Sequence, residues 1–351
     1  MNISKVSDFL CRAIPARRRV LLVGAPGVGK TFSFLEADRR LGRESILMCS
    51  ALEDPSTIRG YPSRGSNGTA EHCLFDGIAR AFAATRPTTL VFDDLGMASE
   101  STMRAIVRLI QFGEIDGRKL PDCVTIGAAT NDVGHGAGVY GMIEPLKSRF
   151  HTILPVETSV DDVVAYGLTH NWPVWLAAFL RNSPDSLHDW KPEKSMKQGG
   201  ACPRGWEYLA EWANDGIDDV EVWAGCVGQG AAVKAHAFWA LQAELPDVDQ
   251  CILDPDGSIV PENPSARLLV GMALAAKLSD RNFGQVVKYL RRLPQMIRAY
   301  SLKDAFRLEA ERLKAGSLPP GYHSISMSPD FSAWVGSADG KEIIGTGTSG
   351  L

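Results

Sequence analysis

The sequence has no long hydrophobic segment and no leader-like beginning. No apolar run approaches the roughly 18 residues that a membrane-spanning helix needs. The residues after Met1 also lack the charged stretch and following apolar stretch of a secretory signal peptide. We therefore expect a cytoplasmic protein with no membrane partner.

Closely spaced cysteines are missing as well. Seven cysteines are spread singly along the 351 residues, and none forms a CxxC pair. An odd, dispersed set speaks against both a disulfide framework and a zinc site. The histidines likewise share no metal-ligand spacing. We expect no bound metal except one that arrives with a substrate.

The chain carries no excess of positive charge. Its net charge of −4 argues against a general attraction to nucleic acid or to anionic membranes. A local basic cluster, Arg12 and Arg17–Arg19, precedes the first expected strand, and we interpret it as a solvated edge. With 45% hydrophobic and 22% charged residues, the composition is that of a soluble globular protein.

Short apolar runs alternate with helical patterns over residues 1 to about 150, which indicates a parallel α/β sheet. Beyond residue 160 the strand signals fade, and alanine, leucine and tryptophan recur at helical spacing. We predict an α/β domain over 1–155, a helical lid over 156–218, and a mostly helical extension over 219–351 with a loose, glycine- and serine-rich tail. Strands are expected at residues 20–23, 45–49, 89–92, 124–128 and 152–154, and helices between them at 32–41, 77–84 and 99–112.

The most informative motif runs from Gly24 to Thr31 and reads GAPGVGKT. It follows an apolar run and precedes a helical pattern, which is the strand–loop–helix context of a phosphate-binding loop. Glycines let several backbone N–H groups point at a phosphate, and the next helix directs its N-terminus at the same anion. In this interpretation Lys30 reaches the β- and γ-phosphates of a nucleotide, and the Thr31 hydroxyl holds Mg²⁺.

An acidic pair, Asp93 and Asp94, ends the apolar strand some sixty residues downstream. Asp93 is placed to contact the Mg²⁺ shell, and Asp94 to orient or deprotonate an attacking water. The alternative, a pair that only starts a turn or caps a helix, is disfavoured because the phosphate loop precedes it. The predicted fold is therefore a P-loop NTPase three-layer α/β/α sandwich with a parallel sheet, followed by the helical lid and the helical C-terminal extension.

The order of these motifs resembles that of the AAA+ ATPases, and within them the MoxR-like family. The strand that ends in Ala-Ala-Thr-Asn131 matches the sensor-1 position, where an amide helps to place water. The segment Glu-Pro-Leu-Lys-Ser-Arg149-Phe looks like the arginine-finger segment, which implies that Arg149 reaches nucleotide held by a neighbouring subunit. Cys-Pro-Arg204-Gly resembles the sensor-2 motif of the lid. The nucleotide contacts are accordingly assigned to Gly24, Ala25, Pro26, Gly27, Val28, Gly29, Lys30, Thr31, Phe32 and Arg204.

Two further segments are similar to MoxR-like proteins. Residues 109–122 match the hairpin that precedes sensor 1, and residues 54–76 fall where the family carries a loop facing a central channel. The resemblance is strongest over residues 20–215 and thins beyond Asp218.

The resemblance implies a Mg²⁺-dependent ATPase that assembles into a homo-oligomeric ring, with a hexamer as the expected size. It also implies a chaperone-like or remodelling action on a protein client, commonly with a von Willebrand factor A-domain partner. Catalytic roles fall to Lys30, Asp94, Asn131 and Arg149, and metal contacts to Thr31 and Asp93.

Two alternatives remain open. The first is an AAA+ motor acting on nucleic acid, which would need a basic, aromatic-bearing channel surface. The second is a nucleotide-gated scaffold that hydrolyses ATP slowly. It stays open because the family usually has Glu where this chain has Asp94. The shorter side chain withdraws the carboxylate, and a displacement of the catalytic group by about 1 Å can slow hydrolysis roughly a hundredfold.

Overall fold

The computed structural model describes residues 1–65, 70–115, 117–132, 141–189, 200–315 and 324–345. The chain divides into two compact units. Met1–Ser159 form the first unit, which also includes Cys202–Arg204, and most described residues from Val160 onward form the second.

A five-stranded, fully parallel sheet with the strand order β2-β5-β8-β1-β9 forms the centre of the first unit. All five strands predicted from the sequence are confirmed, with ends that coincide or differ by at most three residues. They are β1 (Val20–Gly24), β2 (Glu44–Cys49), β5 (Thr88–Asp93), β8 (Val124–Asn131) and β9 (Thr152–Pro155).

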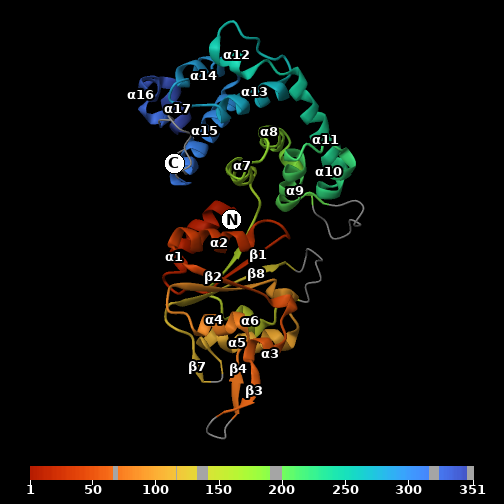
Figure 1. Cartoon of the computed structure of the whole chain (residues 1–351), viewed down its shortest axis with the longest axis vertical. Coiled ribbons are helices and arrows are strands. Elements are labelled where there is room, and N and C mark those ends of the chain that lie inside the picture. Colours follow the sequence, from red (N-terminus) through yellow and green to blue (C-terminus); the bar gives the residue numbers. More distant parts are fainter. Residues whose placement is uncertain (66–69, 116, 133–140, 190–199, 316–323, 346–351) are drawn as a thin grey trace. The chain divides into compact units, whose positions relative to one another are not determined.

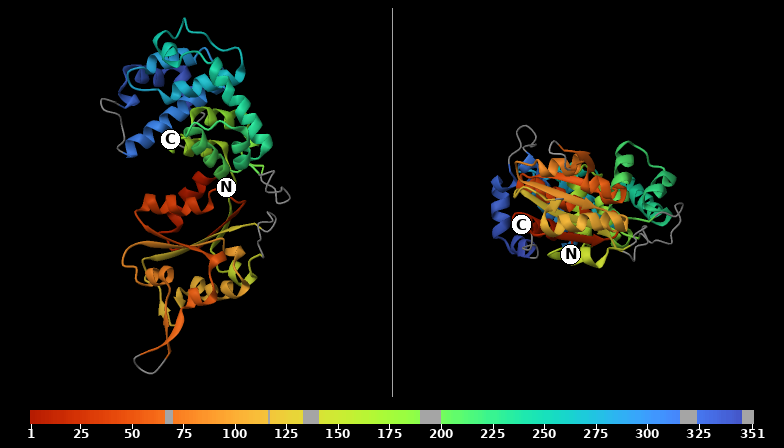
Figure 2. Two further views of the ribbon diagram at one scale, coloured as in Figure 1. Left: turned by 45° about the vertical axis from the view of Figure 1, so that its right-hand side comes forward. Right: turned by 90° about the horizontal axis from the view of Figure 1, so that it is seen from below.

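Helices cover both faces of this sheet, which makes three layers (Figures 1 and 2). Side chains of β1 alternate between the two faces, as expected for a strand buried on both sides. Val20 and Leu22 pack into a cluster with α1 (Ile3–Ala13) and α2 (Lys30–Leu41), whereas Leu21 packs into the cluster on the other face. That other face is covered by α3 (Pro55–Arg59), α4 (Asp76–Phe82), α5 (Glu100–Phe112) and α6 (Glu144–Lys147).

Two small hairpins extend from this core. The hairpin expected within 109–122 is confirmed as β6 (Glu114–Ile115) paired with β7 (Arg118–Lys119). The segment 54–76, expected as a loop, contains α3 and the hairpin of β3 (Tyr61–Arg64) and β4 (Ala70–Cys73) instead. Residues 66–69 of that segment lie outside the described residues. Short 3₁₀ turns η1 (Ser50–Leu52) and η2 (Leu95–Met97) follow β2 and β5.

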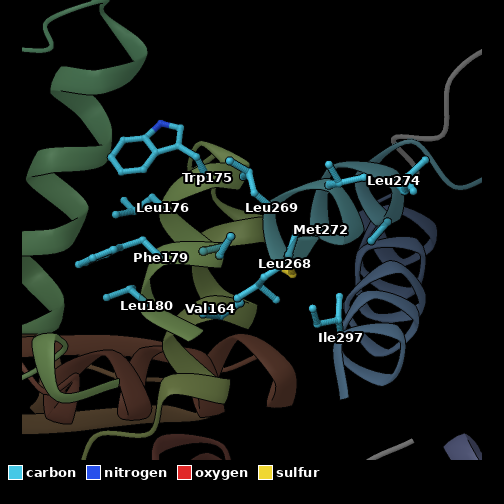
Figure 3. Close-up of a cluster of buried hydrophobic side chains, with 14 of the residues drawn as sticks. Val164, Trp175, Leu176, Phe179, Leu180, Leu268, Leu269, Met272, Leu274 and Ile297 are labelled. Atoms are coloured by element: carbon cyan, nitrogen blue, oxygen red, sulfur yellow. The ribbon is translucent and has the colours of Figure 1, made fainter. Parts of the chain in front are cut away.

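The second unit is helical, as predicted, and the described part contains no helix long and apolar enough to cross a bilayer. A single hydrophobic cluster runs through it and includes side chains of α8, α13 and α15 (Figure 3). Its elements are α7 (Val160–Thr169), α8 (Val174–Asn182), η4 (Pro184–Ser186), α9 (Pro203–Asn214), α10 (Val220–Val227), α11 (Gln229–Ala240), η5 (Leu241–Glu244), α12 (Val248–Leu253), α13 (Pro264–Ala276), α14 (Phe283–Leu290), α15 (Gln295–Ala315), η6 (Ile325–Met327), α16 (Pro329–Gly336) and α17 (Ala338–Gly345).

The lid and the extension predicted to separate at residue 218 share this one cluster, since Trp206 and Trp223 both belong to it. The tail also differs from the expected loose chain, because residues 338–345 form α17. Asp339 accepts a hydrogen bond from the Trp334 indole at 3.0 Å and pairs with Arg298 at 3.0 Å, and Ile343 is buried. Residues 346–351 lie outside the described chain.

A buried ion pair joins α8 to α15 within the second unit. The Arg181 guanidinium donates to both carboxylate oxygens of Asp304, at 2.7 and 3.2 Å, and to Asp161 of α7 at 2.7 Å. The side chains of Arg181 and Asp304 are only 2% and 1% exposed. A planar guanidinium held by two oxygens fixes orientation as well as distance, so this pair aligns the three helices.

We expect Asp304→Ala to lower the free energy of unfolding by about 3–5 kcal/mol, because it leaves a buried guanidinium partly unpaired. Urea titration followed by circular dichroism measures this loss. Lys303→Ala is the matched control, since Lys303 is half-exposed and lies 3.6 Å from Asp161; we expect it to cost about 0.5 kcal/mol or less. A loss below 1 kcal/mol for Asp304→Ala would show that the pair does not hold these helices together.

Candidate functional site

The phosphate-loop motif, the acidic pair and Asn131 meet at the carboxyl edge of the sheet. Gly24, the last residue of β1, is aligned with Asn131, the last residue of β8. Asp93 ends β5, which pairs with β8 on its other side. Because all of these strands are parallel, their carboxyl ends share one edge, where open α/β sheets bind ligands.

The loop between β1 and α2 has a backbone that only glycine adopts readily. Gly27 has φ 73° and Gly29 has φ 92°, both in the left-handed region. Gly29 is also the N-cap of α2 and supplies no side chain to the helix start. The first N–H groups of the helix are therefore available to an anion, and the helix dipole favours one there.

Lys30, the first residue of α2, is 6% exposed and directed back over the loop. Its Nζ donates to Gly24 O at 3.1 Å, Ala25 O at 2.8 Å and Asn131 Oδ1 at 2.8 Å. Burial lowers the pKa of the amine to about 8, so it is still mostly charged at neutral pH. The structure thus places the lysine and the amide, which the sequence assigned separately to one nucleotide site, in direct contact.

Thr31 and Asp93 form a second contact across the site. The Thr31 Oγ1 donates to Asp93 Oδ2 at 2.7 Å. A hydroxyl and a carboxylate side by side are hard oxygen ligands of the kind that Mg²⁺ prefers, and Mg²⁺ commonly keeps several waters and takes few protein ligands. The two residues predicted for the metal are therefore adjacent and chemically suited to it.

Asp94 has an unusual backbone for a residue with a side chain. Its φ of 49° and ψ of 36° are left-handed, a conformation that costs roughly 1–2 kcal/mol but is better tolerated by Asp than by most residues. Its N–H donates to Asp93 Oδ1 at 3.0 Å, while no described residue donates a hydrogen bond to its carboxylate. Burial, together with the neighbouring charge of Asp93, raises the pKa of the Asp94 carboxyl. An unpartnered carboxylate with a raised pKa is suited to accept a proton from water.

Arg204 belongs by its contacts to the first unit, although it lies on the first turn of α9. A Cβ added to Gly27 would lie 2.9 Å from Cys202 Sγ and 3.5 Å from Arg204 Cβ. The segment Cys202–Arg204 therefore packs against the phosphate loop. Arg204 is exposed, and its charge acts on both Lys30 and Asp94. Arg204 thus lies beside the phosphate loop with its side chain exposed.

Arg149 lies at the other edge of the sheet. It comes just before β9, where His151 N donates to Arg19 O at 2.9 Å next to the amino end of β1. Its side chain donates to Gln111 Oε1 at 3.3 Å and to Ser148 Oγ at 2.6 Å. Because β1 is five residues long, the two edges are separated by roughly 15 Å. Arg149 is thus not brought to the site formed by its own chain.

Sequence reasoning missed two features of the site. The helix α1 was not predicted, yet Ile3 packs against the loop, since a Cβ on Gly29 would lie 2.9 Å from Ile3 Cδ1. The spacing of Val6, Leu10 and Ala13 was the available signal for this helix. Thr130 was also missed, although a hydroxyl inside an otherwise apolar, fully buried strand is a recognisable exception.

Comparison with known proteins gives a fold likeness alone. No protein-family model matches the chain, and no curated protein matches it. Among solved structures, a Thermotoga maritima RuvB K64R mutant is 17% identical, with a TM-score of 0.41 and coverage of 92% of this chain and 91% of that one. NtrX from Brucella abortus is 13% identical, with a TM-score of 0.41 and coverage of 87% and 67%. A putative ATPase from Cytophaga hutchinsonii is 12% identical, with a TM-score of 0.33 and coverage of 78% and 74%.

These similarities are too weak to assign a function. The fold class follows from the chain's own features. These are a parallel sheet between two helical layers, a glycine loop that leads into α2, and a buried lysine and an acidic pair at the carboxyl edge of the sheet. The protein has a P-loop NTPase three-layer α/β/α fold followed by a helical region.

Proposed function

We propose that this chain is a Mg²⁺-dependent ATPase of the AAA+ type. One observation carries the proposal: a hydrogen-bonded set at a single sheet edge joins Lys30 to Asn131 and Thr31 to Asp93, with the unpartnered Asp94 beside them. An anion cradle, a metal ligand pair and a residue that orients water are the parts that nucleotide hydrolysis uses, and all three are represented here.

Each residue has a distinct task in this proposal. The loop N–H groups and Lys30 hold the β- and γ-phosphates, and Thr31 and Asp93 hold Mg²⁺, which when bound neutralises charge on the phosphates. Asp94 orients the attacking water and accepts its proton. Asn131 keeps Lys30 aligned and lies where an amide can hydrogen-bond the γ-phosphate or the water.

The position of Arg149 supports action between subunits. It lies at the edge opposite its own phosphate loop, so it can contribute to hydrolysis only at a site on another chain. A head-to-tail contact that places one chain's Arg149 edge against the next chain's nucleotide edge generates a closed ring when the rotation closes. We therefore propose a homo-oligomeric ring, with six subunits and MoxR-like remodelling of a protein client as the form that the sequence resemblance implies.

Lys30→Ala is expected to weaken ATP binding by at least about a hundredfold, because it removes the charged donor that faces the phosphates. Titration of a fluorescent ATP analogue in the presence of Mg²⁺ measures the dissociation constant. Lys5→Ala removes an exposed lysine from α1 and is the control, with binding expected to stay within twofold. Equal affinity for the ATP analogue in wild type and Lys30→Ala would contradict the proposed nucleotide site. Wild-type binding without any hydrolysis at high protein concentration would favour the slow scaffold.

A further inference from the structure

The turn that follows Asp94 is held by a residue with no role so far. Among described residues with side chains, only Arg17, Asp94 and Asn171 have a positive φ. Asp94 alone of these lies at the proposed site. A strained backbone persists only where its surroundings hold it in place, so the contacts of the adjoining turn η2 decide where the Asp94 carboxylate lies.

Besides the bond from Ala98 N to Leu95 O at 3.3 Å, two hydrogen bonds hold that turn. Met97 N donates to Asp94 O at 2.9 Å, within the turn itself. Gly96 N donates to the Thr130 Oγ1 at 3.0 Å, and this bond is buried. The second bond anchors the turn to a different strand, β8, at the residue just before Asn131.

The Thr130 hydroxyl makes a second bond on the other side. It donates to Asn131 O at 3.1 Å, so it accepts from the Asp94 turn and donates to the residue whose amide binds Lys30. Thr130 is 4% exposed and its strand is buried along its whole length. One hydroxyl therefore links the turn that carries the acid to the residue that aligns the lysine.

We propose that Thr130 is a positioning residue for ATP hydrolysis, which sets the Asp94 carboxylate relative to Asn131 and Lys30 through its hydrogen bond with Gly96. This inference rests on the proposed ATPase function. Thr130 is 4% exposed and its hydroxyl bonds only backbone groups of Gly96 and Asn131, so it should change the rate of hydrolysis and not the affinity for ATP.

Thr130→Val tests this because it keeps the shape of the side chain and removes the hydroxyl. We expect single-turnover hydrolysis to slow by about 10- to 100-fold, with the ATP dissociation constant within threefold of wild type. Thr130→Ser, which keeps the hydroxyl, should retain the rate within about threefold. Thr125→Val is the matched control: it removes another buried hydroxyl of β8, which donates to Ile14 O at 3.1 Å, away from the carboxyl edge. We expect this control to leave the rate unchanged.

A structural role alone would give a different pattern in the Asp94→Asn background. If Thr130 acts through Asp94, adding Thr130→Val to Asp94→Asn lowers the residual rate by less than twofold. Three results would each overturn the proposal. The first is a double variant that is slower than Asp94→Asn by the full factor that Thr130→Val causes alone. The others are a Thr130→Ser variant as slow as Thr130→Val, and a Thr130→Val variant as fast as wild type. If Thr130→Val does not fold, Thr130→Ala takes its place.

Amide hydrogen exchange separates this inference from the ATPase proposal. The Gly96 N–H should be protected in wild type and in Thr130→Ser, and should exchange at least tenfold faster in Thr130→Val. A wild-type chain that binds but does not hydrolyse ATP would overturn the ATPase proposal, while the exchange of Gly96 would still show whether Thr130 holds the turn. Unchanged exchange in Thr130→Val would overturn the positioning role even in an active enzyme.

Discussion

Arg149→Ala is expected to lower ATP turnover by about a thousandfold while leaving the ATP dissociation constant within about threefold. A guanidinium that neutralises charge during phosphoryl transfer contributes on the order of 10³–10⁵ in rate, and Arg149 lies too far from its own loop to bind the ground-state nucleotide there. Steady-state hydrolysis over a range of protein concentrations provides the measurement. Specific activity in wild type should rise with concentration, because each site needs a neighbour.

Mixing two inactive variants tests whether Arg149 acts between chains. Arg149→Ala keeps an intact nucleotide site, and Lys30→Ala keeps an intact arginine. In rings assembled at random from equal amounts, half of the subunits have an intact site and half of those have an intact neighbour, so activity should return to about one quarter of wild type. Failure to regain activity in rings shown to be mixed would contradict action between subunits.

Two further variants test whether the effect of Arg149 depends on its guanidinium group and not on positive charge alone. Arg149→Lys keeps the charge but not the planar pair of donors, and it should recover only a small part of the rate. Arg17→Ala removes an exposed guanidinium from a neighbouring position, just before β1, where Arg17 pairs with Asp122 at 2.6 Å. Turnover close to wild type in this control would show that the loss in Arg149→Ala does not come from removing positive charge at this edge.

Much of the first unit could be predicted because its signals are local. Strand β1 is a short apolar run ended by Gly24, and the loop that follows has glycines at the two positions with positive φ, Gly27 and Gly29. Parallel strands bring their carboxyl ends to one edge, so Asp93 and Asn131, which end β5 and β8, lie at the same edge of the sheet.

The features that could not be predicted depend on contacts between distant residues. Nothing around Gly96 in the sequence indicates that its N–H bonds Thr130, 34 residues away. Arg181 and Asp304, 123 residues apart on either side of the boundary expected at residue 218, form an ion pair that no local pattern indicates. Residues 338–345 looked loose from their glycine content, but the Trp334–Asp339 contact and the burial of Ile343 stabilise a helix there.

Asp94→Asn is expected to reduce ATP hydrolysis by at least about a hundredfold without loss of ATP binding. Asparagine preserves size and tolerates the left-handed backbone, but it cannot accept a proton from water. Single-turnover hydrolysis and nucleotide titration measure the two properties. Because burial raises the pKa of the Asp94 carboxyl, its charged form destabilises the fold above its unfolded pKa, so the Asn variant should be at least as stable as wild type at pH 7.

For Asp94→Glu, the structure and the family resemblance predict opposite effects on the rate of ATP hydrolysis. If the shorter acid were only a weakened version of the usual glutamate, the longer side chain would speed hydrolysis. The backbone argues otherwise, because φ at this residue is 49° and glutamate tolerates the left-handed region less well than aspartate. Lengthening the chain by one methylene also moves the carboxylate by about 1 Å, away from the place that the turn and Thr130 have set. We therefore expect Asp94→Glu to hydrolyse ATP about tenfold more slowly than wild type and to melt at a lower temperature. A faster Glu variant of unchanged stability would mean that the chain is a slowed ATPase whose aspartate limits its rate.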